Sequence, residues 1–175
     1  MRTLGGQFVP LRWRGTRRYT HKQMVLNAMV CPITVRADAF ACGVPQRNLR
    51  ISQMHALYLE GTLIPVSALA NGRSIFIEPP SLSVEYHHLD IGPHGIILAE
   101  GTPTESLLNN DASRRGFDNY DPRITMFPDD PACSQAAPWI EAGEMIAALQ
   151  QRYARRAEQQ GFPLHHVDEA DFLLV

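Results

Sequence analysis

Short segments that alternate apolar and polar residues, separated by glycine and proline turns, most strongly limit how this chain can fold. Residues 33–36, 49–52 and 84–89 alternate with a period of two, the pattern of a half-buried β-strand. Shorter apolar segments lie between them, at 56–59, 63–64, 74–78 and 95–99, with Glu60-Gly61 as a hairpin turn. The sequence therefore predicts a mostly β domain, with one short helix at 65–70.

The segments on either side of these strands have different patterns. Residues 1–30 are polar and irregular, with one strand expected at 8–13, so the predicted β-domain spans 1–108. Residues 109–137 are rich in Asn, Asp, Ser and Pro, which is typical of a loop-rich connection. An amphipathic helix and tail are expected over 138–175. Its apolar residues recur every three or four positions, at Trp139, Ala142, Ile146, Leu149 and Tyr153.

Gly161 is placed to end this helix, and the arginines Arg152, Arg155 and Arg156 lie in its last turns. We expect its Arg-rich face to be solvated, with membrane or partner binding as the less favoured alternative.

Length and charge exclude several classes of function. The 175 residues suit one domain, and the formal net charge of −2 gives no sign of a nucleic-acid partner. The densest basic cluster, at Arg14, Arg17 and Arg18, is expected on a solvated edge or loop. No apolar stretch approaches the ~18 residues of a membrane span. The first residues lack the apolar core of a signal peptide, which leaves localisation open.

The cysteines do not form a recognisable metal or redox motif. Cys31, Cys42 and Cys133 are odd in number and widely spaced, and no CxxC unit is present. We interpret them as free, buried thiols. The adjacent His87 and His88 would point to opposite faces of a strand, so at most one could join another histidine. The histidine spacing does not support zinc, and neither a cofactor nor a metal is predicted.

Ser52 and His55 form the most informative polar pair, because a hydroxyl residue stands three positions before a histidine between two apolar strands. A serine hydroxyl can hydrogen-bond the local backbone, and histidine exchanges a proton near neutral pH. Taken alone, the pattern favours a structural histidine in a tight turn. A conventional serine hydrolase is disfavoured because no G-x-S-x-G motif is present.

Several further segments match, in order and spacing, a known family. They are residues 10–15, 32–37, 43–49, 52–57, 63–72, 84–89 and 94–101. The chain from 10 to about 161 resembles the bacterial Hint domain, which is related to Hedgehog autoprocessing domains and inteins. The resemblance implies a Hint-type β-fold in which a cysteine at the start of the domain attacks the preceding peptide bond. Ser52 and His55 occupy the T-x-x-H motif, and His94 resembles the histidine of a late motif.

The chain also departs from the family pattern. None of its cysteines matches the family nucleophile, so we expect a domain without its first strands, truncated at the N-terminus and inactive in self-cleavage. Asn48 replaces a usually acidic residue, and no His-Asn pair lies near 102–108, which argues against full splicing.

The expected partner follows from this departure. It is either an N-terminally fused polypeptide or the missing strand segment, with self-association as a further expectation. The alternative function is a non-catalytic binding module at the end of an exported bacterial protein, whose exposed strand edge would be the docking site.

Overall fold

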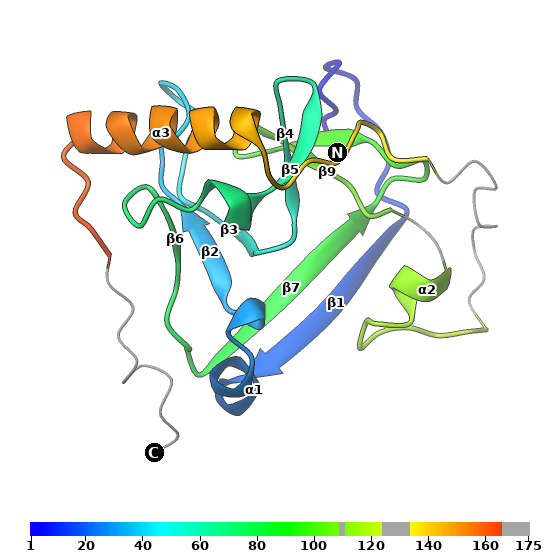
Figure 1. The fold of residues 1–175 in the computed structure, drawn as a ribbon. Helices are drawn as coiled ribbons and strands as arrows, with labels where there is room; N and C mark the ends of the chain where they lie inside the picture. The colour runs from blue at the N-terminus through cyan, green and yellow to red at the C-terminus, as the bar shows by residue number, and fades with distance from the viewer. Residues whose placement is uncertain (109–110, 124–133, 166–175) are drawn as a thin grey trace.

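The computed structural model describes residues 1–108, 111–123 and 134–165, which form three antiparallel sheets and a long C-terminal helix (Figure 1). A two-stranded ribbon pairs β1 (Trp13–Thr20) with β7 (Ser83–Asp90). A second sheet has the order β3-β2-β6, and a third the order β5-β4-β9-β8. Their strands are β2 (Pro32–Val35), β3 (Leu49–Ser52), β6 (Ile75–Ile77), β4 (Ala56–Leu59), β5 (Thr62–Pro65), β8 (Ile96–Ala99) and β9 (Thr102–Glu105).

The helices are fewer than the strands. They are α1 (His21–Leu26), the short α2 (Asp111–Arg114) and α3 (Glu144–Gln159), with 3₁₀ turns at Ala28–Val30 and Val66–Leu69. The predicted mostly β fold with a C-terminal helix is confirmed. The strands predicted from 33 to 99 are all present within a residue or two, and a 3₁₀ turn occupies the place of the expected short helix.

The prediction for the N-terminal segment was wrong. In residues 8–13, Phe8 makes only an isolated bridge to Arg2, and the strand begins at Trp13. The strand then passes through the basic cluster, where the Arg18 guanidinium lies 2.8 Å from the Glu85 carboxylate. The helix α1 was also missed, although Thr20 and Gln23 form a capping box at its start. For residues 13–20, tertiary pairing with β7 rather than the local sequence pattern makes this polar segment a strand.

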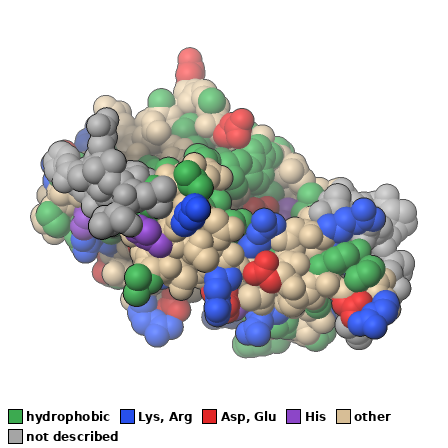
Figure 2. Space-filling view, turned by 90° about the horizontal axis from the view of Figure 1, so that it is seen from below, with side chains coloured by type: hydrophobic (Ala, Val, Ile, Leu, Met, Phe, Trp, Pro, Cys, Tyr) green, Lys and Arg blue, Asp and Glu red, His purple; other side chains and the backbone are tan. Residues whose placement is uncertain are grey.

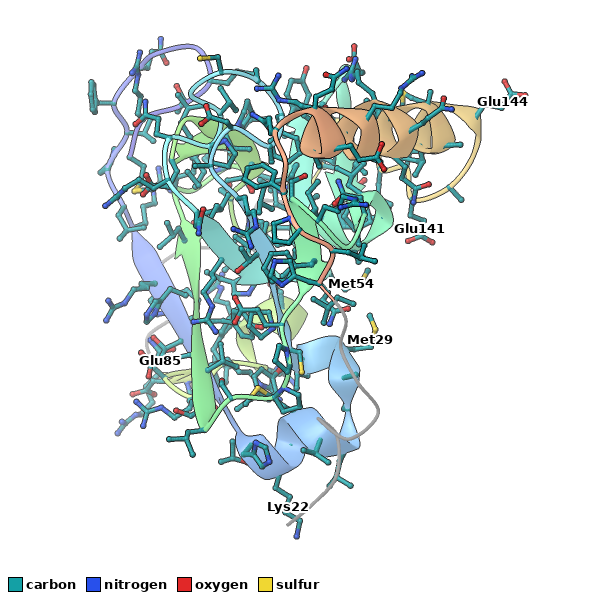
Figure 3. The ribbon with its side chains drawn as sticks, turned by 90° about the vertical axis from the view of Figure 1, so that its left-hand side faces the viewer. Lys22, Met29, Met54, Glu85, Glu141 and Glu144 are labelled. Carbon is teal, nitrogen blue, oxygen red and sulfur yellow. The ribbon has the colours of Figure 1, made fainter. Side chains whose placement is uncertain are left out.

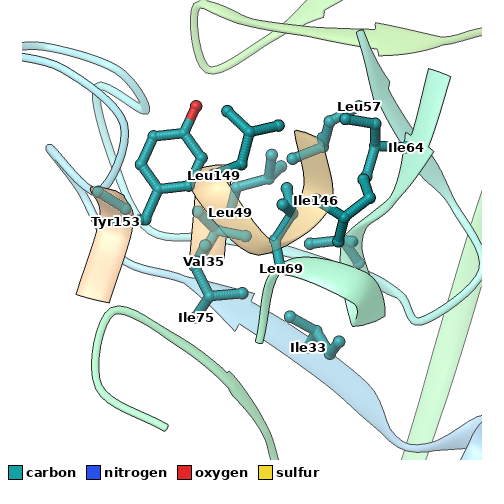
Figure 4. Close-up of a cluster of buried hydrophobic side chains, with 12 residues drawn as sticks. Ile33, Val35, Leu49, Leu57, Ile64, Leu69, Ile75, Ile146, Leu149 and Tyr153 are labelled. Atoms are coloured by element: carbon teal, nitrogen blue, oxygen red, sulfur yellow. The ribbon is translucent and has the colours of Figure 1, made fainter. Parts of the chain in front are cut away.

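The main core lies where α3 covers the sheets. Its buried side chains come from five strands, the helix, the 3₁₀ turn Val66–Leu69 and the loop at Ala39, and Figure 4 shows them as one cluster. Ile146, Leu149 and Tyr153 supply the helix face, as predicted, and the Tyr153 ring packs edge-on against Phe40. Such packing stabilises a helix far more than its intrinsic propensity does.

The start and the polar face of α3 differ from the predictions. Trp139 lies before the helix in a bridge to Leu63, and Gly143 with φ +112° precedes the first helical residue. The arginine face is not wholly solvated, because Arg156 donates to the Asp38 carbonyl at 2.7 Å and Arg152 pairs with Glu60 at 3.0 Å. The helix is therefore held to the body of the domain on both faces.

Candidate functional site

The predicted pair Ser52 and His55 lies in the tight turn that joins β3 to β4. The His55 backbone N–H donates to the Ser52 carbonyl at 3.1 Å, which closes the turn. Between them, Gln53 is 2% exposed, and its side-chain amide donates to the carbonyls of Ala28 at 2.6 Å and Cys31 at 3.1 Å. The turn is thus anchored from inside the domain, so the positions of Ser52 and His55 are set by buried hydrogen bonds.

The His55 ring lies against a second histidine, His88 of β7. Their ring centroids are 5.8 Å apart, and Phe117 contacts the other side of His88 at 5.1 Å. Gly15 stands opposite His88 in the β1–β7 ladder. A Cβ atom at Gly15 would come within 2.8 Å of the Trp13 and Phe117 rings. Glycine at this position therefore lets the aromatic side chains close over His88.

Glu105, at the end of β9, connects the His55 turn to His94. One carboxylate oxygen, Oε1, accepts the backbone N–H of Ala56 at 2.8 Å, directly after His55. The other, Oε2, lies 3.3 Å from Nε2 of His94. The His94 side chain is only 2% exposed and that of Glu105 16% exposed. A single buried carboxylate therefore contacts both segments that carry the predicted histidines.

The hydrogen bonds of His94 determine its tautomer. Its Nδ1 accepts the backbone N–H of Ala136 at 3.0 Å, so this nitrogen carries no proton. The neutral ring then has its proton on Nε2, facing Glu105. Nε2 lacks an aligned hydrogen-bond partner, so its contact with the carboxylate is electrostatic rather than a directed hydrogen bond. His94 thus presents Nε2 to the Glu105 carboxylate at 3.3 Å without an aligned hydrogen bond.

Burial sets the proton affinity of this cluster. It lowers the pKa of His55, while the Glu105 carboxylate and backbone act in the opposite direction. Burial and, to a lesser extent, the nearby His55 together lower the pKa of His88 to about 4. For Glu105, burial alone would raise the pKa, but His94, His55 and the Ala56 N–H together lower it. The two histidines are therefore neutral at pH 7 beside an ionised carboxylate.

Three cavities meet at His88. One of about 240 Å³ is lined by Ser52, His55 and His88, and another of about 190 Å³ by His55, His88 and Glu105. A third, of about 270 Å³, extends from Ser52 to the exposed side chains of Met29 and Met54. Figure 3 shows these two methionines on the same side of the molecule. The polar cluster formed by Ser52, His55, His88 and Glu105 thus lines these cavities.

Comparison with known proteins bears directly on this site. A family model for the Hint domain matches residues 1–111, which is more than half of the chain. The chain belongs to the Hint domain family. No curated protein and no solved structure matched it significantly. The match supports an autoprocessing-type domain in general, and all of the clustered residues fall within it.

The side chains of the two described cysteines, Cys31 and Cys42, do not line the cavities around His88. Cys31 is buried, with its Sγ 3.9 Å from the Met24 carbonyl, and burial raises the pKa of its thiol. Cys42 is exposed in the loop before β3, against the expectation of burial. Cys133 lies outside the described residues.

The structure brings together more polar residues around Ser52 and His55 than the sequence indicated. Sequence patterns gave no indication of Glu105, because its partners are far away along the chain. Of the adjacent histidines His87 and His88, only His88 joins the cluster, as the strand alternation allowed. From its place after the helix, His165 would be expected to be exposed, but it is half-buried, with its ring stacked on Phe76 at 3.8 Å. His166 lies outside the described residues.

Other expected properties concern the surface. In the described parts of the chain, no helix has the length and apolar character to cross a membrane, and no three His, Cys, Asp or Glu side chains have a metal-binding arrangement. Figure 2 shows Lys and Arg side chains spread over one face, with acidic side chains beside several of them.

Proposed function

We propose that this Hint domain binds a peptide bond beside the Ser52–His55 turn and handles the proton of its cleavage, while this chain performs no self-cleavage alone. The observation that carries the proposal is the arrangement of the turn. Ser52 and His55 line a cavity, and His55 lies between His88 and Glu105, with neither described cysteine in the cavity.

The chemistry of such a site can be written step by step. A thiol attacks the carbonyl carbon of the peptide bond, a C–S bond forms, and the C–N bond breaks to leave a thioester and an amine. Since burial lowers the pKa of His55, its resting ring is neutral and takes up the thiol proton. The resulting imidazolium, close to the Glu105 carboxylate, returns this proton to the leaving nitrogen. Atoms and charge balance without any cofactor.

Each polar group has a proposed role in this scheme. Ser52 orients the backbone of the bound peptide, as a hydroxyl in a turn can do. His94 supports the Glu105 carboxylate through its Nε2 proton rather than touching the reacting atoms. The attacking thiol would come from the bound polypeptide, because burial raises the pKa of Cys31 and Cys42 lies in a separate loop.

A thiol introduced at the site tests the proton-handling role of His55. In Ser52→Cys, we expect alkylation by iodoacetamide at pH 7 to be about tenfold faster than in Ser52→Cys/His55→Gln, because His55 accepts the thiol proton. Both variants would carry Cys42→Ser and Cys133→Ser, so that alkylation at position 52 is followed without these two thiols. Equal rates in the two variants would contradict a proton-handling role.

A fusion tests the absence of self-cleavage. A folded reporter protein joined before Met1 should stay intact when incubated with dithiothreitol between pH 6 and 9, as followed by mass spectrometry. Cleavage near Met1 would overturn this part of the proposal. The variants Cys31→Ala, Cys42→Ser and Cys133→Ser would then show which thiol attacks.

The second candidate function is a non-catalytic binding module. It is favoured by a specific observation, which is that two strand edges beside the cluster lack hydrogen-bond partners. This feature is argued through in the next subsection.

A further inference from the structure

The strand β7 has one paired and one open edge. The backbone N–H and C=O of Thr16 and the N–H of Arg18 bond to residues 118 and 119, so these positions of β1 face away from β7. The alternate positions of β1 therefore bond to Tyr86 and His88. The backbone groups of Glu85 and His87 must then point away from β1.

The strand β3 has an open edge of the same kind. At the two ends of the β2–β6 pairing, the Glu78 N–H donates to the Pro32 carbonyl and the Arg36 N–H to the Ser74 carbonyl, so the even-numbered residues of β2 bond toward β6. Ile33 and Val35 therefore bond toward β3, at Ile51 and Leu49. The backbone groups of Arg50 consequently point away from β2.

Residues of the open edges of β3 and β7 line the same cavity. The cavity of about 240 Å³ is lined by residues 50–52 of β3 on one side and by residues 85–88 of β7 on the other. Figure 1 shows β3 beside β7, with β1 on the far side of β7. Within the described parts of the chain, the backbone groups of Arg50, Glu85 and His87 have no hydrogen-bond partner. Open edges of this kind are rarely left uncovered in proteins.

The open stretch ends at the polar cluster. One residue beyond His88, the Leu89 carbonyl accepts the N–H of Leu107, so the segment that follows β9 closes the edge of β7 there. Ser52 and His55 line the same cavity as the open backbone groups. At a rise of about 3.3 Å per residue, the stretch between these limits accommodates one strand of about four residues.

We propose that this gap, which we call the β3–β7 slot, binds one extended peptide strand that hydrogen-bonds to both edges at once. An extended backbone presents donors and acceptors on alternate sides, so it satisfies Arg50 on one side and Glu85 and His87 on the other. The slot recognises the backbone of the peptide rather than its side chains, so binding depends little on the sequence of the peptide. A peptide carbonyl then lies beside His55. The inference rests on the proposed function only for that placement, because strand binding is measurable without cleavage.

Amide hydrogen exchange of the free protein, followed by NMR, is the first test. We expect the amides of Glu85 and His87 to exchange at least about tenfold faster than those of Tyr86 and His88, because only the latter bond to β1. Similar protection along the whole of β7 would overturn the proposal, since the edge would then already be covered. Protection of Glu85 and His87 that rises with protein concentration would also overturn it, since a second copy would be the occupant.

A peptide of eight alternating Thr and Val residues, acetylated and amidated, is the probe for binding. It should slow exchange at Arg50, Glu85 and His87 several-fold. The same peptide N-methylated at every valine should have a much smaller effect, because it lacks donors toward one edge. Equal effects of the two peptides, or slowing confined to other sites, would overturn the proposal.

A protein variant provides the matched control. His87→Pro removes an N–H group that faces the slot and leaves the β1–β7 hydrogen bonds in place, so it should fold and bind the peptide more weakly. Retained slow exchange at Tyr86 and His88 would show that the ribbon is intact. Unchanged binding by this folded variant would contradict the slot. If peptide binding holds and the alkylation test of His55 fails, the slot stands and the proposed chemistry does not.

Discussion

The two halves of the molecule are built from similar strands but differ in how completely they are filled. Under α3, Leu57, Ile64 and Leu69 are fully buried, and the apolar cluster around them is continuous (Figure 4). Around β7, three cavities meet, backbone groups lack partners, and the buried side chains include two histidines and a carboxylate. Beneath α3 the interior is closed by packing, and the open space of this half is a shallow groove of about 810 Å³ along Ala70, Ala147 and Ala154. The second half instead keeps polar groups next to its cavities.

This difference separates the half that stabilises the domain from the half that we propose to bind a peptide. Apolar burial contributes about 25 cal/mol per Å², so the α3 half supplies most of the folding energy. Buried neutral histidines and uncovered strand edges cost stability, and such features concentrate at functional sites. Perturbing the two halves separately should therefore affect different measurements.

The largest effect is expected in the α3 half. Replacing Leu57 with alanine should lower the free energy of unfolding by about 2–5 kcal/mol, because the side chain is 0% exposed and its removal leaves a cavity. Urea denaturation measures this change. Leu82→Ala is the control, since Leu82 is 92% exposed and should change stability by less than about 0.5 kcal/mol. Equal losses in the free energy of unfolding for Leu57→Ala and Leu82→Ala would contradict the proposed difference between the two halves.

The β7 half should dominate the pH dependence. The pKa of His88 is about 4 in the folded protein and about 6.5 when unfolded, so the unfolded state binds more protons between these values. Stability is therefore complete above pH 6.5 and falls by about 3 kcal/mol as the pH is lowered to 4. Urea denaturation across this range should show a shallower slope in His88→Phe.

The control for this prediction comes from the other half. Leu149→Val removes one buried methylene under α3 and should lower stability at every pH while keeping the wild-type slope. An unchanged slope in His88→Phe would show that the histidine is not buried in its neutral form.

A smaller effect is expected at the first turn of α1, next to the ribbon. Thr20→Ala removes the hydroxyl that caps this helix through the Gln23 N–H and should cost about 1 kcal/mol. Thermal unfolding measures the loss, and Thr20→Ser should restore most of it. A loss as large as that of Leu57→Ala would show that the ribbon half contributes more stability than its packing indicates.

The smallest stability change is expected for Glu105→Gln, which keeps an acceptor for Ala56 and removes the charge. Because the carboxylate raises the pKa of His55, this variant should lower the pKa further, as measured by NMR titration of the ring. Glu100→Gln is the matched control, since Glu100 pairs with Arg47 instead. Equal pKa changes in the two variants would contradict a direct action of Glu105 on His55.

Local pattern was sufficient for much of the fold. The alternation at 49–52 and 84–89 predicted β3 and β7, because a half-buried strand leaves a period of two in the sequence. The alternation at 33–36 also predicted a strand, but β2 is buried along its whole length rather than half-buried, because it lies between β3 and β6. The spacing of Ile146, Leu149 and Tyr153 likewise predicted the packed face of α3. It could not determine where the helix begins, because Trp139 continues the apolar spacing while bonding to β5 as an extended segment.

The sequence by itself determined that this chain is a mostly β Hint-type domain and that Ser52 and His55 share one turn. Only the tertiary structure brought His88 against His55 and Glu105 between His55 and His94. It also decided that two strand edges stay open beside them. The physical reason is the separation along the chain over which each effect acts, since strand periodicity and turn chemistry depend on only a few neighbouring residues. Burial, proton affinity and edge pairing depend on segments that are distant in the chain and meet only after folding.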